Sequence, residues 1–249
     1  MAISSLVNYG TMYVRGLSLA YVDAENIKIE PGSCRYKNNL GDIISDTSLN
    51  INLNKIGPGG VDISYSTGTL VLYVYMIADS SQNLPVSCMA TSDINFTNES
   101  EKFPIGYDSY RRIGAVAIKS GDFKNFFQYG KDENRTYFYN DTETVLSANG
   151  TGSFVPVSLI SWAPAIESEA IFTCAYTYSS APADNIVEFL PFGSTSTQGI
   201  IKLNIQGPSQ EFQIKCPYAL DGGVNPKILI KYQAADNVKL LISGYCDYL

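Results

Sequence analysis

The chain has 249 residues, 45% of them hydrophobic, which is enough for one large domain or two modest ones with a buried core. Only 16% of the residues are charged, and the net charge is −7. Because binding to a phosphate backbone normally depends on clustered Lys and Arg, an acidic chain whose 17 basic residues are scattered argues against a nucleic-acid partner.

The start of the chain and its longest apolar stretches bear on its location. Residues 1–6 lack the basic region and long apolar run of a secretory signal, and no stretch approaches the roughly 20 apolar residues of a membrane span. We therefore expect synthesis in the cytoplasm and no membrane partner. With 18 Tyr and 11 Phe but few charges, the surface is expected to suit large, static protein contacts.

The periodic segments of the first half alternate with period two and are rich in Val, Ile, Thr, Tyr and Phe, which predicts strands rather than helices. The predicted strands are residues 12–19, 27–30, 48–53, 70–77 and 113–118. The segments 70–77 and 113–118 are apolar at successive positions. We therefore expect both strands in the middle of a sandwich, covered on each face.

The composition shifts to Asn, Asp, Thr, Tyr and Gly between residues 122 and 152, which predicts a domain boundary near residue 145. Seven strand candidates follow, several of them separated by Gly or Pro: 153–162, 170–178, 186–190, 199–205, 211–216, 227–232 and 238–245. Short strands at this spacing are typical of a β-sandwich. The sequence predicts an all-β protein of two sandwich-like modules, 1–145 and 146–249, the second of them jelly-roll or Ig-like.

The composition offers few candidates for catalytic residues. The chain contains no histidine, so neither a Ser-His-Asp nor a Cys-His system can be built. Paired carboxylates, as in glycosidases, remain an alternative, with Glu167 and Glu169 or Asp122 and Asp132 as candidates. The simpler interpretation is that these are solvated surface carboxylates, and we expect no enzymatic activity.

Metal and disulfide chemistry are also poorly supported. Five cysteines without CxxC spacing or histidine argue against the usual zinc sites, and we expect buried thiols and no cofactor. The alternative for the cysteines is a disulfide, for which Cys174 and Cys216 are the candidates because they lie in neighbouring predicted strands. A calcium site would have to come from an irregular loop such as Asp132 to Asp141.

An ordered series of short segments spans about residues 12–127. They are GLSL (16–19), IKIEPGSC (27–34), GGVD (59–62), YVYMI (73–77), PIGY (104–107) and RRIGA (111–115). The series resembles the N-terminal module of tail-fibre-like and other appendage proteins of tailed-bacteriophage virions. The resemblance implies a virion location and a non-enzymatic structural role, in a tail or collar fibre, a connector or a head decoration. No long shaft is present, which favours the connector, collar or decoration roles.

The segment after Pro104 supplies the candidate interface residues. Tyr107, Tyr110, Arg111 and Arg112 are of the two residue types most often found as interface anchors. An equally supported alternative is a packed corner, with the Arg stems lying along the sheet. The expected partners are copies of the chain itself, in a homo-oligomer with a trimer among the options, and other virion proteins.

Two further functions stay open at this point. The chain would act as a carbohydrate- or receptor-binding module of a tail fibre if Trp162 and exposed tyrosines stacked on the sugars of a host surface glycan. A glycan-degrading enzyme ranks last, because it would need one of the carboxylate pairs in a shared pocket.

Overall fold

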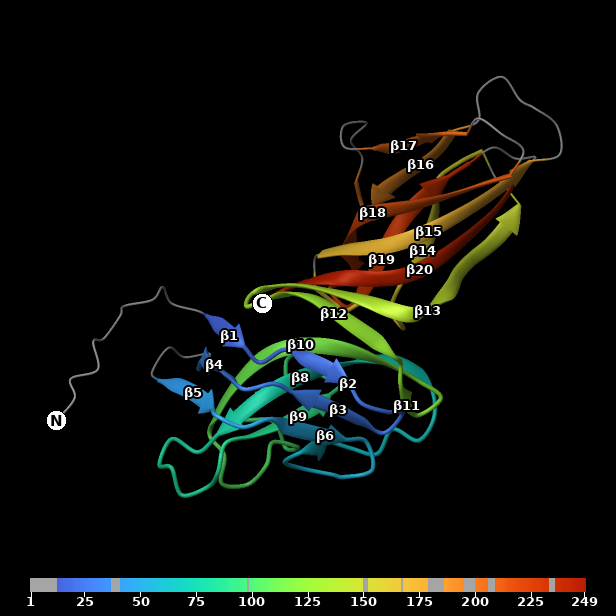
Figure 1. Cartoon of the computed structure of the whole chain (residues 1–249). Coiled ribbons are helices and arrows are strands. Elements are labelled where there is room, and N and C mark those ends of the chain that lie inside the picture. Colours follow the sequence, from blue (N-terminus) through green and yellow to red (C-terminus); the bar gives the residue numbers. More distant parts are fainter. Residues whose placement is uncertain are drawn as a thin grey trace.

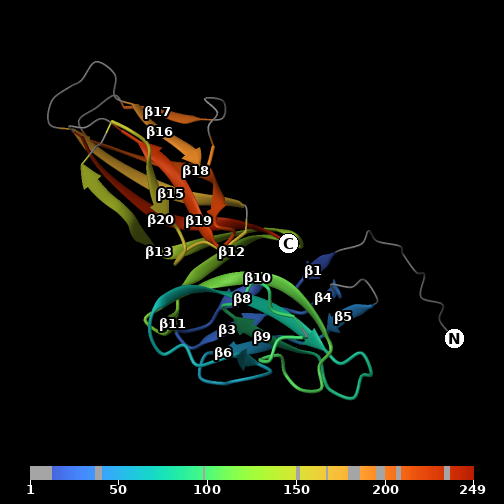
Figure 2. The ribbon, with the colours of Figure 1, turned by 180° about the vertical axis from the view of Figure 1, so that it is seen from behind.

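The computed structural model describes residues 13–36, 41–97, 99–149, 152–166, 168–178, 186–194, 200–205, 209–232 and 236–249. Within these ranges the chain forms strands β1 to β20 and no helix, so the described residues contain no helix that could span a membrane. The prediction of an all-β protein is confirmed. Figures 1 and 2 show two β-rich bodies in contact, with the N-terminal half in blue to green and the C-terminal half in yellow to red.

The N-terminal half is built around one five-stranded sheet. Its order is β11 (Asp122–Phe123), β10 (Ser109–Lys119), β8 (Thr69–Ala78), β9 (Ser87–Thr91) and β7 (Gly60–Val61). A three-stranded sheet has the order β2 (Leu19–Tyr21), β3 (Asn26–Ile29) and β6 (Leu49–Asn52), and a second one has the order β1 (Val14–Gly16), β4 (Gly32–Arg35) and β5 (Asp42–Ser45). Both small sheets lie beside the central one (Figure 1) and share its hydrophobic core.

Strands β8 and β10 are antiparallel neighbours, and both are covered on each face, as predicted for residues 70–77 and 113–118. Leu72, Val74 and Met76 point into the main core with the two small sheets. Tyr73, Tyr75 and Ile77 point the other way, into a second cluster that includes Phe96 and Phe103. Successive apolar residues are therefore needed in β8, because water reaches neither face.

The seven strand candidates of the C-terminal half each overlap an observed strand. The strands are β14 (Val155–Ser158), β15 (Ser168–Tyr178), β16 (Ile186–Pro191), β17 (Ile201–Asn204), β18 (Ser209–Asp221), β19 (Asn225–Lys231) and β20 (Asp236–Tyr248). The hairpin of β12 (Phe126–Lys131) and β13 (Asn134–Asn149) joins them, in the order β12-β13-β20-β15-β18-β19-β16-β17, and β14 also pairs with β19.

Strand β18 connects two layers of this half. Its first part pairs with β15, whereas its last three residues, Ala219 to Asp221, pair with β19. Inward-facing side chains from β15, β18 and β20 meet those of β14, β16 and β19 in one core; Phe172, Tyr176, Phe189, Ile228 and Leu240 are examples. The result is a sandwich-like packing.

The change from one half to the other occurs earlier than residue 145, which lies inside β13. Phe123 is the last residue of the N-terminal sheet, and Phe126 begins the first strand of the C-terminal sheet. We therefore use the names N-terminal module for residues 13–123 and C-terminal module for the described residues from 126 onward. One hydrophobic cluster runs through both modules.

Candidate interaction site

The two modules meet where the inner face of β13 and β20 lies on β10. Tyr137 is 1% exposed and stacks on Tyr245, with ring centroids 5.1 Å apart. The Tyr245 hydroxyl donates a hydrogen bond to the carbonyl oxygen of Ala115 in β10. A Cβ at Gly114 would lie 2.6 Å from the Tyr137 hydroxyl oxygen. Glycine is thus the residue that lets the modules approach this closely.

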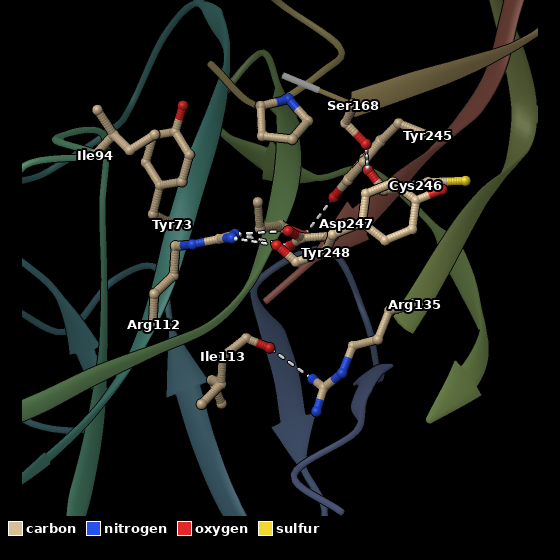
Figure 3. A network of polar contacts seen from close by, with 12 residues as sticks. Tyr73, Ile94, Arg112, Ile113, Arg135, Ser168, Tyr245, Cys246, Asp247 and Tyr248 are labelled. Carbon is tan, nitrogen blue, oxygen red and sulfur yellow. Dashed lines mark hydrogen bonds and ion pairs between the residues drawn. The ribbon is translucent and has the colours of Figure 1, made fainter. Parts of the chain in front are cut away.

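An ion pair crosses the same junction (Figure 3). Arg112 Nη1 in β10 donates to both carboxylate oxygens of Asp247 in β20, at 2.8 and 2.9 Å. The Asp247 side chain is fully buried and that of Arg112 is 18% exposed. Burial opposes the charge on Arg112, yet the charge and hydrogen bonds of Asp247 leave the pKa of Arg112 raised. Arg112 therefore stays charged in the folded protein.

Arg135 in β13 forms a second buried contact with the N-terminal module. Its Nη1 donates to the carbonyl oxygens of Leu17, at 2.9 Å, and Ile113, at 2.6 Å. Its Nη2 donates to Gly16 O at 2.7 Å, and its Nε donates to Asp132 O at 2.8 Å. Gly16 and Leu17 both have positive φ, 63° and 52°, a backbone conformation that leucine rarely adopts. Arg135 thus holds an unusual segment of the N-terminal module in place.

The outer face of β12, β13 and β20 carries exposed rings. Phe127 is 66% exposed, Tyr129 68%, Phe138 39% and Tyr248 46%. Phe127 and Phe138 are directly opposite each other in the β12–β13 ladder. Thr136 lies opposite Cys246, with its Oγ1 3.6 Å from the sulfur, so Tyr248, two residues further along β20, projects on the same side. We call Phe127, Tyr129, Phe138 and Tyr248 the aromatic face.

The aromatic face is backed by buried rings and bordered by an ion pair. Behind it, Phe126 and Tyr137 pack in the buried core, with ring centroids 5.7 Å apart. At its border the Tyr248 hydroxyl donates to Glu169 at 2.7 Å, and Lys215 pairs with Glu169 at 2.6 Å. Partial burial would raise the pKa of Glu169, but the bonds from Lys215 and Tyr248 outweigh it and lower that pKa. The ion pair of Glu169 and Lys215 at this border therefore has no net charge.

The structure places the four predicted interface residues within contacts of the chain itself. Tyr107 follows the turn at Gly106, and its hydroxyl donates to Pro85 O at 3.1 Å. Tyr110 packs against Phe103, with ring centroids 5.8 Å apart.

The two arginines lie further inside. Arg111 is 7% exposed, and burial lowers its pKa. Arg112 makes the ion pair with Asp247. These contacts match the packed-corner alternative. A role of the four residues in binding a partner stays a prediction.

Trp162, the candidate for sugar stacking, is half-buried beside the C-terminal end of β10. Its ring lies 5.9 Å from the Lys119 ammonium and 5.7 Å from that of Lys124. Its carbonyl oxygen accepts a hydrogen bond from the Tyr139 hydroxyl. Glu143 pairs with both lysines, at 2.8 and 2.5 Å. The two ammonium groups beside the Trp162 ring are therefore bonded to a carboxylate of the chain itself.

Asp122 and Asp132, one of the two candidate carboxylate pairs, lie far apart. Asp122 lies opposite Lys119 at one end of β10, whereas Asp132 lies near Arg135, which contacts Ile113. Six residues of extended strand separate the two places by about 20 Å, well beyond the spacing that glycosidases need. Glu167 lies outside the described residues, and Glu169 is occupied by Lys215 and Tyr248.

The five cysteines are buried and free, so the disulfide between Cys174 and Cys216 is wrong. Their strands, β15 and β18, are indeed neighbours, but Cys174 lies opposite Phe212 and Cys216 lies opposite Ala170. The suggested calcium loop, residues 132–141, is also wrong as a loop, because β13 begins at Asn134. Among the described residues no cluster of His, Cys, Asp and Glu could hold a metal ion.

A groove of about 290 Å3 lies at the seam between the modules. Leu70, Val71 and Val224 line it together with the polar Asp93 and Asn95. The ring that lines it, Tyr73, is only 4% exposed. The groove thus offers no accessible ring and no paired titratable groups, and the aromatic face is the stronger candidate for contact with a partner.

Comparison with known proteins adds only weak similarities. No family model and no curated protein matches the chain. A solved structure of BuGH86wt in complex with neoagarooctaose is 10% identical, with a TM-score of 0.22, over 91% of this chain and 33% of that one. A structure of infectious bursal disease virus Gx strain is 10% identical, with a TM-score of 0.21, over 95% of this chain and 66% of that one. The chain thus spans less than two thirds of either protein, and at these TM-scores neither similarity carries an argument about function.

Proposed function

We propose that this chain is a non-enzymatic structural protein of a tailed-phage virion, acting through protein–protein contacts in a connector, collar, tail fibre or head decoration. The observation that carries the proposal is the aromatic face, on strands whose reverse side is locked to the N-terminal module. A rigid, apolar and sparsely charged sheet face is typical of a surface that a partner covers.

The chemistry of the chain supports the same function. The sequence has no histidine, and the carboxylate Glu169 is held ionised by Lys215 and Tyr248. In contrast, the junction contacts of Arg112 and Arg135 make the two modules a stiff unit, which suits a part that transmits load in a particle. The resemblance of residues 12–127 to appendage proteins of phage virions points to the kind of particle.

Immunogold electron microscopy tests this proposal. Antibody raised against the purified chain is applied to intact particles of a phage that encodes it, with particles lacking the gene as the control. We expect gold at one defined place on the particle. If label is found only on soluble protein from the lysate, the virion function is wrong.

A second candidate function is binding of a host surface glycan. The observation in its favour is Tyr129, whose exposed ring and hydroxyl could stack on a sugar and also bond to it. Trp162 is a weaker platform, because Lys119 and Lys124 lie beside its ring. A glycan array with the wild-type chain and Tyr129→Ala distinguishes this function, since a sugar site loses its signal in the variant.

A further inference from the structure

We propose that the partner on the aromatic face is a second copy of this chain, packed face to face around a twofold axis. This inference rests on the proposed function, because it names which protein covers the surface. Four observations lead to it: the exposed ring area, the charge of the surroundings, the contacts of β2 with β12 and the order of the rings on the two strands.

The exposed area matches a large part of what a dimer needs. A buried aromatic side chain covers about 200 Å2, so the exposed fractions of the four rings leave about 400 Å2 of aromatic surface per copy. That is about half of the roughly 800 Å2 that each partner contributes to a standard interface. Thr136 and the half-buried Ile171 of the neighbouring β15 extend the same side of the sheet. A monomer would leave this area exposed to water.

The charge distribution favours contact between copies at this place. Each copy carries a net charge of −7, so two copies repel each other over most of their surfaces. Phe127, Tyr129, Thr136 and Phe138 are uncharged, and the Glu169–Lys215 pair at the border is neutral. The four residues and the ion pair therefore add no net charge to that repulsion.

Contacts of β2 hinder edge-to-edge pairing at β12, the strand that carries Phe127 and Tyr129. Strand β2 lies close to β12. Gln128 Oε1 accepts a hydrogen bond from Leu19 N at 2.8 Å, and Phe126 packs edge-on against Tyr21 with ring centroids 6.4 Å apart. A second chain that added a strand at β12 would have to fit beside β2.

The arrangement of the rings suits a self-complementary contact. In a twofold interface the same patch meets itself, so residues on the axis contact their own counterparts. Phe127 and Phe138 form one row across the two strands, and Tyr129 lies two residues from Phe127. Rotating such a row by half a turn places rings of one copy beside rings of the other, in the offset contacts that aromatic pairs prefer.

Sedimentation over a concentration series measures the dimer. We expect the Phe127→Ser, Phe138→Ser double variant to weaken self-association by at least about 30-fold, because central aromatic anchors carry most of an interface's affinity. Ile105→Ser is the matched control, since Ile105 is 99% exposed and lies in the N-terminal module away from β12. A thermal melt of each variant establishes that it is folded.

Cross-linking gives a second measurement that does not depend on removing rings. The five native cysteines are buried, so Phe138→Cys introduces an accessible thiol on the aromatic face. A short bis-maleimide should link two copies of this variant into a covalent dimer. Ile105→Cys should give no such product under the same conditions.

Each other outcome overturns the inference. These outcomes are a monomeric wild-type chain, a double variant that associates like wild type, and a threefold assembly that the double variant abolishes. Loss of glycan binding in the double variant with unchanged sedimentation assigns the face to a sugar instead. If particles carry the gold label while the chain is monomeric, only this inference fails. If the dimer forms through the face but particles carry no label, only the virion function fails.

Discussion

Arg112 and Asp247, 135 positions apart, form a two-pronged ion pair whose carboxylate is fully shielded from water. One partner belongs to β10 of the N-terminal module and the other to β20 of the C-terminal module. The pair therefore couples the stability of one module to the presence of the other. The same strands also carry the Tyr245 to Ala115 hydrogen bond.

Removing one member of this pair should be costly. Asp247→Ala leaves the Arg112 charge partly buried without a counter-charge, and we expect a loss of about 3 kcal/mol in the free energy of unfolding. The double variant Arg112→Leu, Asp247→Leu should recover much of that loss, because it leaves no unpaired charge. Guanidinium unfolding curves measure both. A loss below about 1 kcal/mol in the single variant would show that water reaches the pair.

Arg135 should tolerate no substitution, not even by lysine. A lysine ammonium has three donors and cannot reproduce the planar fork that bonds Gly16 O, Leu17 O, Ile113 O and Asp132 O. We expect Arg135→Lys to cost about 2 kcal/mol or more, because buried carbonyl groups lose their donors. Hydrogen exchange should show the largest increase near Leu17. Unchanged protection there would mean that Gly16 and Leu17 keep their left-handed conformation without the hydrogen bonds of Arg135.

The strands were predictable where burial and periodicity agree. Residues 70–77 are apolar at every position, and β8 is covered on both faces. In the C-terminal half, Gly and Pro separate segments that alternate cleanly, and each matches a strand. By contrast, the Asn, Asp and Thr of residues 134–149 favour loops, yet this segment is β13. Pairing with β12 and β20 outweighs that local preference.

The candidate site was less predictable, for two physical reasons. No local pattern indicates that Arg112 pairs with Asp247, because the contact depends on the packing of two modules. The adjacent rings Phe126 and Phe127 point to opposite faces of β12, one buried and one exposed, and composition does not distinguish them. The one sequence signal that points to this face is the alternation of Phe127 with Tyr129, which places both rings on one side if the segment is a strand.

The four residues of the packed corner give a prediction about stability. Tyr107→Ala with Arg111→Ala should lower the melting temperature, because Arg111 is 7% exposed and Tyr107 bonds to Pro85 O. Self-association of the protein that stays folded should be unchanged. Light scattering beside a thermal melt measures both quantities. A variant that melts like wild type but no longer associates would restore the interface role of this segment.

The cysteines should be unreactive in the folded protein. Burial raises the pKa of Cys34, Cys88, Cys174 and Cys216 to about 12, so few thiolates exist near neutral pH. We expect a thiol reagent at pH 8 to label these four cysteines very slowly in native protein and fast in guanidinium. Electrophoretic mobility should be the same with and without reductant. A shift on reduction would indicate a disulfide.

Acid should weaken the C-terminal module through Glu188. Hydrogen bonds from Lys231, at 2.8 Å, and Lys202 lower its pKa in the folded state. A lowered pKa contributes stability that is fully present above the unfolded pKa of about 4.3 and is lost as pH falls through the folded value. We expect Glu188→Gln to cost about 0.5–1 kcal/mol at pH 7 and almost nothing at pH 2. A pH-independent difference would contradict this.

The order of strands in the C-terminal sheet determines when it can form during synthesis. β20 lies between β13 and β15 in the sheet but follows both in the chain. On the ribosome, β13 and β15 must therefore wait, with their facing edges unpaired, until residues 236–248 have emerged. Until then Asp247 is not available to pair with Arg112, and Tyr245 is not available to stack on Tyr137. The nascent chain thus passes through a stage in which its N-terminal module is complete in sequence but its junction with β20 has not yet formed.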